Sequence, residues 1–210
     1  MGPDQLPYVR NAVKALFAGD PGGHDEFHTE RVYRTAMKLA DTEPCDRQIV
    51  ALAALLHDVD DPKLFSTEAN ENARQILSGA GVAPETAGRV IAIINKVAYK
   101  GTDTQVPETI EGKIVQDADR LDAIGAIGIA RAFAYGGSRG RAMYDPDIPP
   151  RPDMDEAAYR SRNSTTINHF YEKLLLLEGM MNTDCAKRMA RARTQVMTDF
   201  LAEFLAEWNG

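Results

Sequence analysis

Histidine is scarce in this chain, and three of its four copies lie in the first 57 residues. His24 and His28 are four residues apart, so both fall on one face of a helix. His57 is followed directly by Asp58, at the end of the apolar stretch 49–56. Burying a carboxylate there is unfavourable unless a cation or a hydrogen-bond donor meets it. Imidazole and carboxylate together suit a divalent transition metal, although the pair could instead cap the helix end and the next turn.

A second group of acidic residues interrupts the apolar segment 114–128. It consists of Asp117, Asp119 and Asp122. On a helix, at least one of these carboxylates must point inward among small side chains, where it needs a positively charged partner. Arg120 could serve one of the three aspartates but not all of them. The segment therefore predicts a second source of buried negative charge.

Three stretches share an order of residues that is known from one enzyme family. They read Gly-His-Asp-x-x-His-x-x-Arg-Val at 23–32, His-Asp-Val-Asp-Asp-Pro-Lys at 57–63 and Asp-Ala-Asp-Arg-Leu-Asp-Ala-Ile-Gly at 117–125. This order resembles the HD superfamily of metal-dependent phosphohydrolases, whose signature is H…HD…D on a helical bundle. The resemblance covers most of the chain. The segment Asn-His-Phe-Tyr-Glu-Lys-Leu at 168–174 is similar to stand-alone bacterial members of the YpgQ/YedJ type.

The resemblance implies one divalent metal ion, with Mn²⁺ favoured and Ni²⁺, Co²⁺, Fe²⁺, Zn²⁺ or Mg²⁺ as alternatives. Its ligands would be His28, His57, Asp58 and Asp119. Asp119 is chosen from the triplet because the family pattern places its last ligand directly before an Arg-Leu or similar pair. Relatives with two metals carry further histidines before the last aspartate, and this chain has none between 57 and 119. Four protein ligands leave positions on a six-coordinate ion for water and a substrate oxygen.

Phosphoryl chemistry also needs a proton acceptor and positive charge for the phosphate oxygens. Asp61 matches approximately the position of an acidic residue that follows HD in some nucleotide-cleaving relatives, but it could equally be a turn residue before Pro62. His24 could hold the leaving group or orient water, or could simply be hydrogen-bonded. The candidate phosphate-binding residues, each of which could instead be a solvated surface cation, are Arg31, Lys63 and Lys100.

The expected substrate is a nucleotide or a related small phosphate ester. The YpgQ-like resemblance favours release of pyrophosphate from nucleoside triphosphates, and a nucleoside 5′-monophosphate phosphatase is the nearest enzymatic alternative. Two alternatives from other classes are a regulatory or scaffold protein whose metal is only structural and an interaction module without metal. The expected assembly is a monomer or a homodimer.

The elements that position these residues are predicted to be helices, because apolar residues recur at three- and four-residue spacing and strand-like alternation is scarce. We predict an all-α fold with a single domain over 1–210, a metal-site core at about 24–125 and C-terminal helices at about 155–208 packed on it. Asp46 is the predicted cap of the helix with body 49–56. The segment 136–153 is irregular and is typical of a lid, a binding loop or disorder. Other helices are expected from His24, from Ser66 to Gly79, from Pro84, from 107 to 135, through 169–177 and over 184–208.

Composition narrows the classes of partner. The 210 residues carry a net charge of −7, which argues against a nucleic-acid polymer as the main partner but allows a locally basic pocket. No run of 18 apolar residues is present, so no membrane span is expected, and the N-terminus lacks the apolar core of a secretory signal. Cys45 and Cys185 form no C-x-x-C pair. We expect free thiols and a cytoplasmic location.

Overall fold

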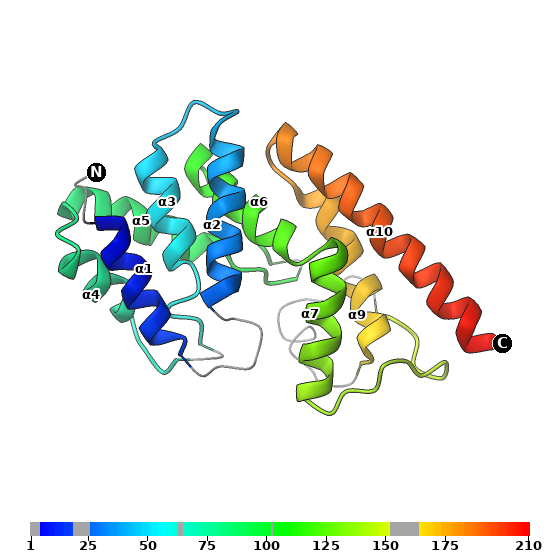
Figure 1. Ribbon diagram of the computed structural model, residues 1–210. Helices are drawn as coiled ribbons and strands as arrows, with labels where there is room; N and C mark the ends of the chain where they lie inside the picture. Colours follow the sequence, from blue (N-terminus) through cyan, green and yellow to red (C-terminus); the bar gives the residue numbers. More distant parts are fainter. Residues whose placement is uncertain (1–4, 19–25, 63–64, 102, 152–163) are drawn as a thin grey trace. The chain divides into compact units, whose positions relative to one another are not determined.

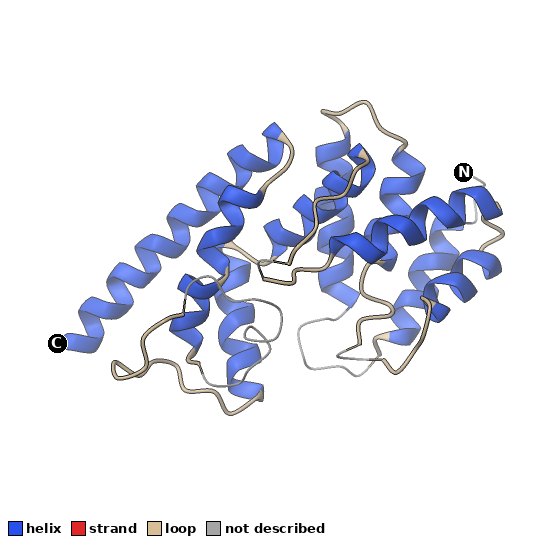
Figure 2. Cartoon of the chain, turned by 180° about the vertical axis from the view of Figure 1, so that it is seen from behind, coloured by secondary structure: helices blue, strands red, loops and turns tan. Residues whose placement is uncertain are grey.

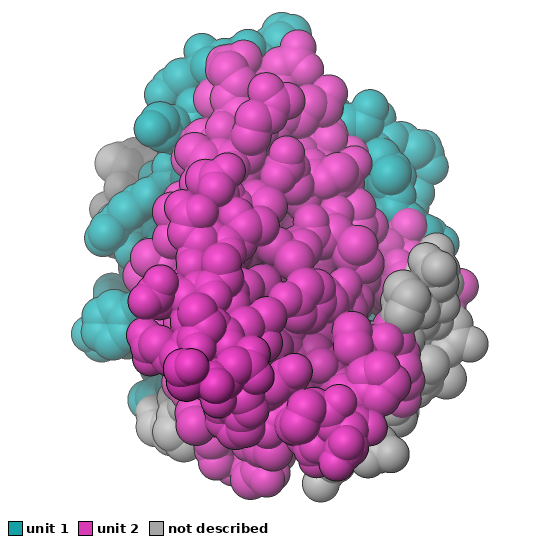
Figure 3. Space-filling view, turned by 90° about the vertical axis from the view of Figure 1, so that its right-hand side faces the viewer, with its two compact units in different colours: residues 1–98, 105–119 teal, residues 99–104, 120–210 magenta. Residues whose placement is uncertain are grey.

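The computed structural model describes residues 5–18, 26–62, 65–101, 103–151 and 164–210. Within these ranges every regular element is a helix (Figures 1 and 2), so the predicted all-α class is confirmed. None of the described helices combines the length and apolarity needed to cross a membrane. The chain divides into two compact units, 1–98 with 105–119 and 99–104 with 120–210, which Figure 3 colours separately. The single domain over 1–210 stays a prediction.

The first unit is built around one buried helix. Every residue from Ile49 to Leu56 is buried in it, as predicted for a helix that is apolar on all sides. The predicted cap is also confirmed, because Asp46 accepts hydrogen bonds from the N–H groups of Gln48 and Ile49 at 3.0 and 3.3 Å. This helix, α3, packs against α1, α2 and α5. The helices of the unit are α1 (Gln5–Leu16), α2 (Glu26–Ala40), α3 (Arg47–Leu56), α4 (Glu71–Gly79), α5 (Pro84–Val97) and most of α6 (Ile110–Asp122).

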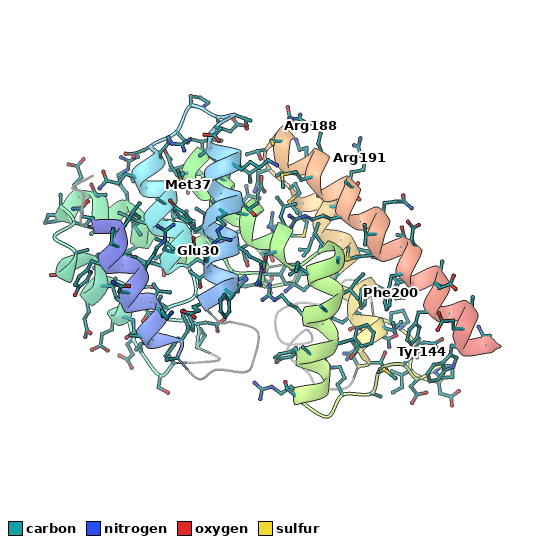
Figure 4. The ribbon with its side chains drawn as sticks, in the orientation of Figure 1. Glu30, Met37, Tyr144, Arg188, Arg191 and Phe200 are labelled. Atoms are coloured by element: carbon teal, nitrogen blue, oxygen red, sulfur yellow. The ribbon has the colours of Figure 1, made fainter. Side chains whose placement is uncertain are left out.

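The second unit contains a cluster of aromatic side chains around the buried Phe170. Phe200, which is labelled in Figure 4, projects from α10. Its ring packs on those of Phe133 and Phe170, with ring centroids 5.8 Å away in both cases. Such tilted and edge-to-face contacts are favoured by the ring quadrupoles. The longest helix, α10, packs along α7 and the 3₁₀ helix η1. The elements of this unit, besides the end of α6, are α7 (Gly125–Ser138), α9 (Thr166–Glu172), η1 (Leu174–Met180) and α10 (Asp184–Asn209).

The prediction of one continuous helix from 107 to 135 is wrong. The structure has two helices there, α6 and α7, separated at Ala123 and Ile124. Gly125 adopts φ +77, a left-handed conformation that glycine takes without strain. Gly128 then approaches the preceding loop so closely that a Cβ atom would lie 2.3 Å from the Ala123 carbonyl oxygen. The break therefore depends on two glycines in a segment that otherwise reads as continuous helix.

Two further boundaries differ from expectation. Helix α4 starts at Glu71 and not at Ser66, because Ala69 and Asn70 both have left-handed backbones that interrupt a helix. One helix was expected through 169–177, but the α-helix ends at Glu172 and the 3₁₀ helix η1 follows Lys173. The φ of Lys173 is −144, which lies outside the helical region and separates the two elements. The last helix, predicted over 184–208, is found as α10.

The segment expected to be irregular is shorter at its start than predicted. Helix α7 continues to Ser138, and 139–151 contain no helix or strand. The last two residues of the predicted range, 152–153, lie outside the described part of the chain.

Candidate metal centre

Four side chains from three separate places meet in the first unit. His28 comes from α2, His57 and Asp58 come from the end of α3, and Asp119 comes from α6. The Nε2 atoms of the two buried histidines lie 3.2 Å apart. Asp58 Oδ2 lies 3.3 and 3.4 Å from these nitrogens of His28 and His57. Asp119 Oδ1 lies 3.5 and 3.7 Å from the same two atoms.

His57 is oriented by the end of its helix. It is the C-cap residue of α3, and its Nδ1–H group donates to the Ala54 carbonyl oxygen at 3.0 Å. Because Nδ1 is engaged by the backbone, Nε2 is the nitrogen that faces Asp58 and Asp119. The helix-cap and metal-site interpretations of the His–Asp pair are therefore compatible, since one ring nitrogen caps the helix and the other belongs to the cluster.

The aspartate triplet of α6 separates into different environments. Asp117 and Asp122 are buried, and Asp122 forms an ion pair with Arg131 at 2.8 Å. Asp119 is the most accessible of the three, with 28% of its side chain exposed. The expectation of at least one inward carboxylate is thus confirmed, and Asp119 is the one that approaches the histidines.

Burial and opposite charges together set the pKa values in this cluster. Burial alone would lower the pKa of His57, but the Asp58 and Asp119 carboxylates outweigh it and raise the pKa to about 9. Burial would likewise raise the pKa of Asp119, but its hydrogen bond and charge interaction with His57 lower that pKa to about 2. The two carboxylates therefore retain a proton on the imidazole in the absence of another cation.

The donor set fits one divalent cation. Nitrogen and oxygen atoms that share an ion at about 2.0–2.2 Å lie roughly 3–4 Å from each other. Here the two histidine Nε2 atoms lie 3.2 Å apart, and each lies 3.3 to 3.7 Å from a carboxylate oxygen of Asp58 and of Asp119. Three of the residues, His28, His57 and Asp119, each offer an atom within 4.8 Å of the others. Mixed imidazole and carboxylate donors suit Mn²⁺, Fe²⁺, Co²⁺, Ni²⁺ and Zn²⁺.

The remaining predicted site residues are only partly gathered here. Asp61 lies in the same turn as Asp58, because its N–H donates to the Asp58 carbonyl oxygen at 3.0 Å. Arg31 is half-buried on α2, three residues beyond His28. Lys100 is exposed and belongs to the second unit. His24 and Lys63 lie outside the described residues.

Sequence reasoning missed Asp60, which holds the turn after the His–Asp pair. Its carboxylate accepts hydrogen bonds from the Thr67 hydroxyl at 2.7 Å and from the N–H groups of Asn72 and Ala73 at 3.0 and 2.9 Å. An N-capping residue usually lies directly before the first turn of its helix. Asp60 lies well upstream of α4, so no local pattern indicates this contact.

Comparison with known proteins identifies the family to which this chain is similar. Residues 26–124 match the model of the HD domain. The uncharacterized protein YpgQ of Bacillus subtilis is 39% identical over 204 residues, which cover 95% of this chain and 91% of YpgQ. The matched segment contains helices α2 to α6 of the first unit and all four residues of the cluster.

Solved structures agree in fold over nearly the full length. A Lactobacillus plantarum protein has a TM-score of 0.90 at 41% identity, covering 100% of this chain and 98% of its own. An HD-superfamily hydrolase of Bacillus thuringiensis has a TM-score of 0.78 at 42% identity, covering 99% and 98%. The crystal structure of Bacillus subtilis YpgQ in complex with ADP has a TM-score of 0.77 at 36% identity, covering 96% and 97%.

Proposed function

The chain belongs to the HD superfamily as a stand-alone metal-dependent phosphohydrolase of the YpgQ type, and we propose that it hydrolyses nucleoside triphosphates and releases pyrophosphate. The observation that carries the proposal is the convergence of imidazole and carboxylate donors from α2, α3 and α6. A nucleotide substrate is supported by the ADP bound to YpgQ, a relative with the same fold. Membership in a hydrolase family favours an enzyme over the regulatory or scaffold alternative.

In this proposal one divalent ion is held by His28, His57, Asp58 and Asp119, and the family resemblance favours Mn²⁺ among the ions that imidazole and carboxylate donors suit. When bound, such an ion offsets charge on phosphate oxygens and lowers the pKa of a coordinated water. The Nδ1–H bond of His57 to the Ala54 carbonyl keeps its imidazole in the orientation that this role requires.

The remaining groups handle the proton and the phosphates. Asp61 accepts the proton of the attacking water, from a position in the same turn as Asp58. The water oxygen bonds to the α-phosphorus, the bond from that phosphorus to the bridging oxygen breaks, and pyrophosphate leaves with the electron pair. His24 orients the water or the leaving group. The phosphate-binding residues of this proposal are those expected from the sequence, Arg31, Lys63 and Lys100.

The test is a product analysis with nucleoside tri-, di- and monophosphates, each with Mn²⁺, Mg²⁺, Co²⁺ or Ni²⁺. Pyrophosphate and the nucleoside monophosphate are expected from triphosphates. Asp119→Asn removes one negative charge from the cluster, so its turnover should fall by more than the roughly 10–100-fold typical of outer-shell changes. Orthophosphate from monophosphates alone would favour the 5′-monophosphatase. No turnover of any phosphate ester by fully metallated protein would contradict both.

A further inference from the structure

Helix α4 is capped by a residue from outside its own segment. Its N-cap residue, Asn70, has a left-handed backbone and makes no side-chain capping bond. The free N–H groups of Asn72 and Ala73 donate instead to the two carboxylate oxygens of Asp60, at 3.0 and 2.9 Å. A carboxylate at the positive end of a helix is a favourable contact. The first turn of α4 therefore depends on the turn that follows α3.

A second link joins a side chain of α4 to the backbone of the turn after α3. The Asn72 side chain donates from Nδ2 to the Val59 carbonyl oxygen at 2.7 Å. The Thr67 hydroxyl donates to Asp60 at 2.7 Å. With the two bonds from backbone N–H groups, these contacts fix both residues of the turn: Val59 through its main-chain carbonyl and Asp60 through its side-chain carboxylate. All of them lie within the first unit.

The clamped residues directly follow His57 and Asp58, which offer two of the four donor atoms of the cluster. We propose that Asp60 and Asn72 are positioning residues for the metal centre. By fixing the turn after α3 to the first turn of α4, they fix where the Asp58 carboxylate lies relative to the imidazoles, 3.3 and 3.4 Å away. The inference rests on the ligand set of the proposed function.

A purely structural role for the clamp makes a different prediction. If Asp60 and Asn72 only stabilise α4, their loss lowers the unfolding temperature but leaves metal affinity of the folded chain unchanged. If they position Asp58, the folded chain binds metal more weakly because ligand atoms must be brought together on binding. Metal affinity and unfolding temperature therefore separate the two roles.

The test compares Asp60→Ala and Asn72→Ala with the control Asp46→Ala in the full-length chain. Asp46 is the same residue type and accepts from two backbone N–H groups, those of Gln48 and Ile49, but at the other end of α3. Asn72→Ala removes the bond to Val59 and leaves the backbone bonds of α4 in place. Asp60→Asn provides a milder change if Asp60→Ala does not fold. Mn²⁺ affinity is measured by calorimetry, ligand geometry by the visible spectrum with Co²⁺, and stability by melting of the metal-free protein.

We expect Asp60→Ala and Asp46→Ala to melt at lower temperature than the wild type. The clamp variants should also bind Mn²⁺ about tenfold more weakly and show a changed Co²⁺ spectrum, whereas Asp46→Ala should bind like the wild type. Clamp variants with unchanged Mn²⁺ affinity and an unchanged Co²⁺ spectrum would overturn the positioning role and leave the ligand set intact. A wild-type chain that binds no Mn²⁺ would overturn the ligand set, and this proposal with it.

Discussion

The two ring nitrogens of His57 have different partners. Nδ1 is bound to the backbone of its own helix, and Nε2 lies within 3.7 Å of His28, Asp58 and Asp119 atoms. With a pKa raised to about 9 by the two carboxylates, this imidazole is protonated at neutral pH in the metal-free protein. An ion entering the cluster therefore has to displace a proton.

Metal binding should consequently depend on pH. Because the pKa of His57 is raised to about 9, Mn²⁺ affinity should rise about tenfold per pH unit up to that value and then level off. Calorimetry in buffers with different ionisation enthalpies should detect about one proton released per ion at neutral pH. An affinity that is flat between neutral pH and pH 9 would show that His57 does not carry the displaced proton.

The residues of the cluster were predictable from the sequence, but their support was not. The order His28, His57–Asp58 and Asp119 can be recognised in the sequence because it resembles the signature of the HD superfamily. Asp60 was not identified, because its role depends on Asn72 and Ala73 lying against it in space. Sequence patterns report neighbours along the chain, and these contacts join residues 12 and 13 positions apart.

Helices could be predicted from the sequence where the pattern of apolar residues is sufficient to form them. The buried α3 and the long α10 were both expected, and both are found. The boundary between α6 and α7 was missed because periodicity continues across it. The break coincides with the left-handed backbone of Gly125 and with the close approach of Gly128 to the Ala123 carbonyl oxygen, which only the packed chain shows.

The cause of this break can be tested by replacing each of two glycines of α7 with alanine, in separate variants. At Gly128 an added Cβ atom would lie 2.3 Å from the Ala123 carbonyl oxygen, so Gly128→Ala should lower the free energy of unfolding by about 1–3 kcal/mol. At Gly137 the same atom meets nothing within 4 Å, so Gly137→Ala should be neutral or stabilising by up to about 1 kcal/mol. Denaturant unfolding of both variants measures the difference. Equal effects would mean that close packing at Gly128 does not define the break.

At the scale of the whole molecule, α6 belongs to both compact units. Its residues up to Asp119 are part of the first unit, and Arg120 begins the second. Arg120 donates through Nη1 to the Met180 carbonyl oxygen, and Arg193 donates to the Leu121 carbonyl oxygen. The last turn of the helix that carries a candidate ligand is thus tied into the second unit.

Metal binding should therefore stabilise both units. An ion present at about 100 times its Kd adds about 2.7 kcal/mol to the native state. The single tryptophan, Trp208, lies in α10 of the second unit, so its fluorescence reports that unit, while circular dichroism reports all helices. We expect Mn²⁺ to raise the melting temperature seen by both signals, and a chelator to reverse the rise. A shift in circular dichroism with an unmoved tryptophan transition would show that α6 does not couple the units.

The shared helix also limits how this protein can be dissected. A cut between Asp119 and Arg120, where the units divide, would fall inside α6 (Ile110–Asp122). The first fragment would then carry its last donor residue on a frayed terminal turn, where carbonyl groups lose their hydrogen-bond partners. Separately expressed halves should include the whole of α6 in the metal-binding fragment, and the other half would then lack the turn that anchors Met180 and Arg193.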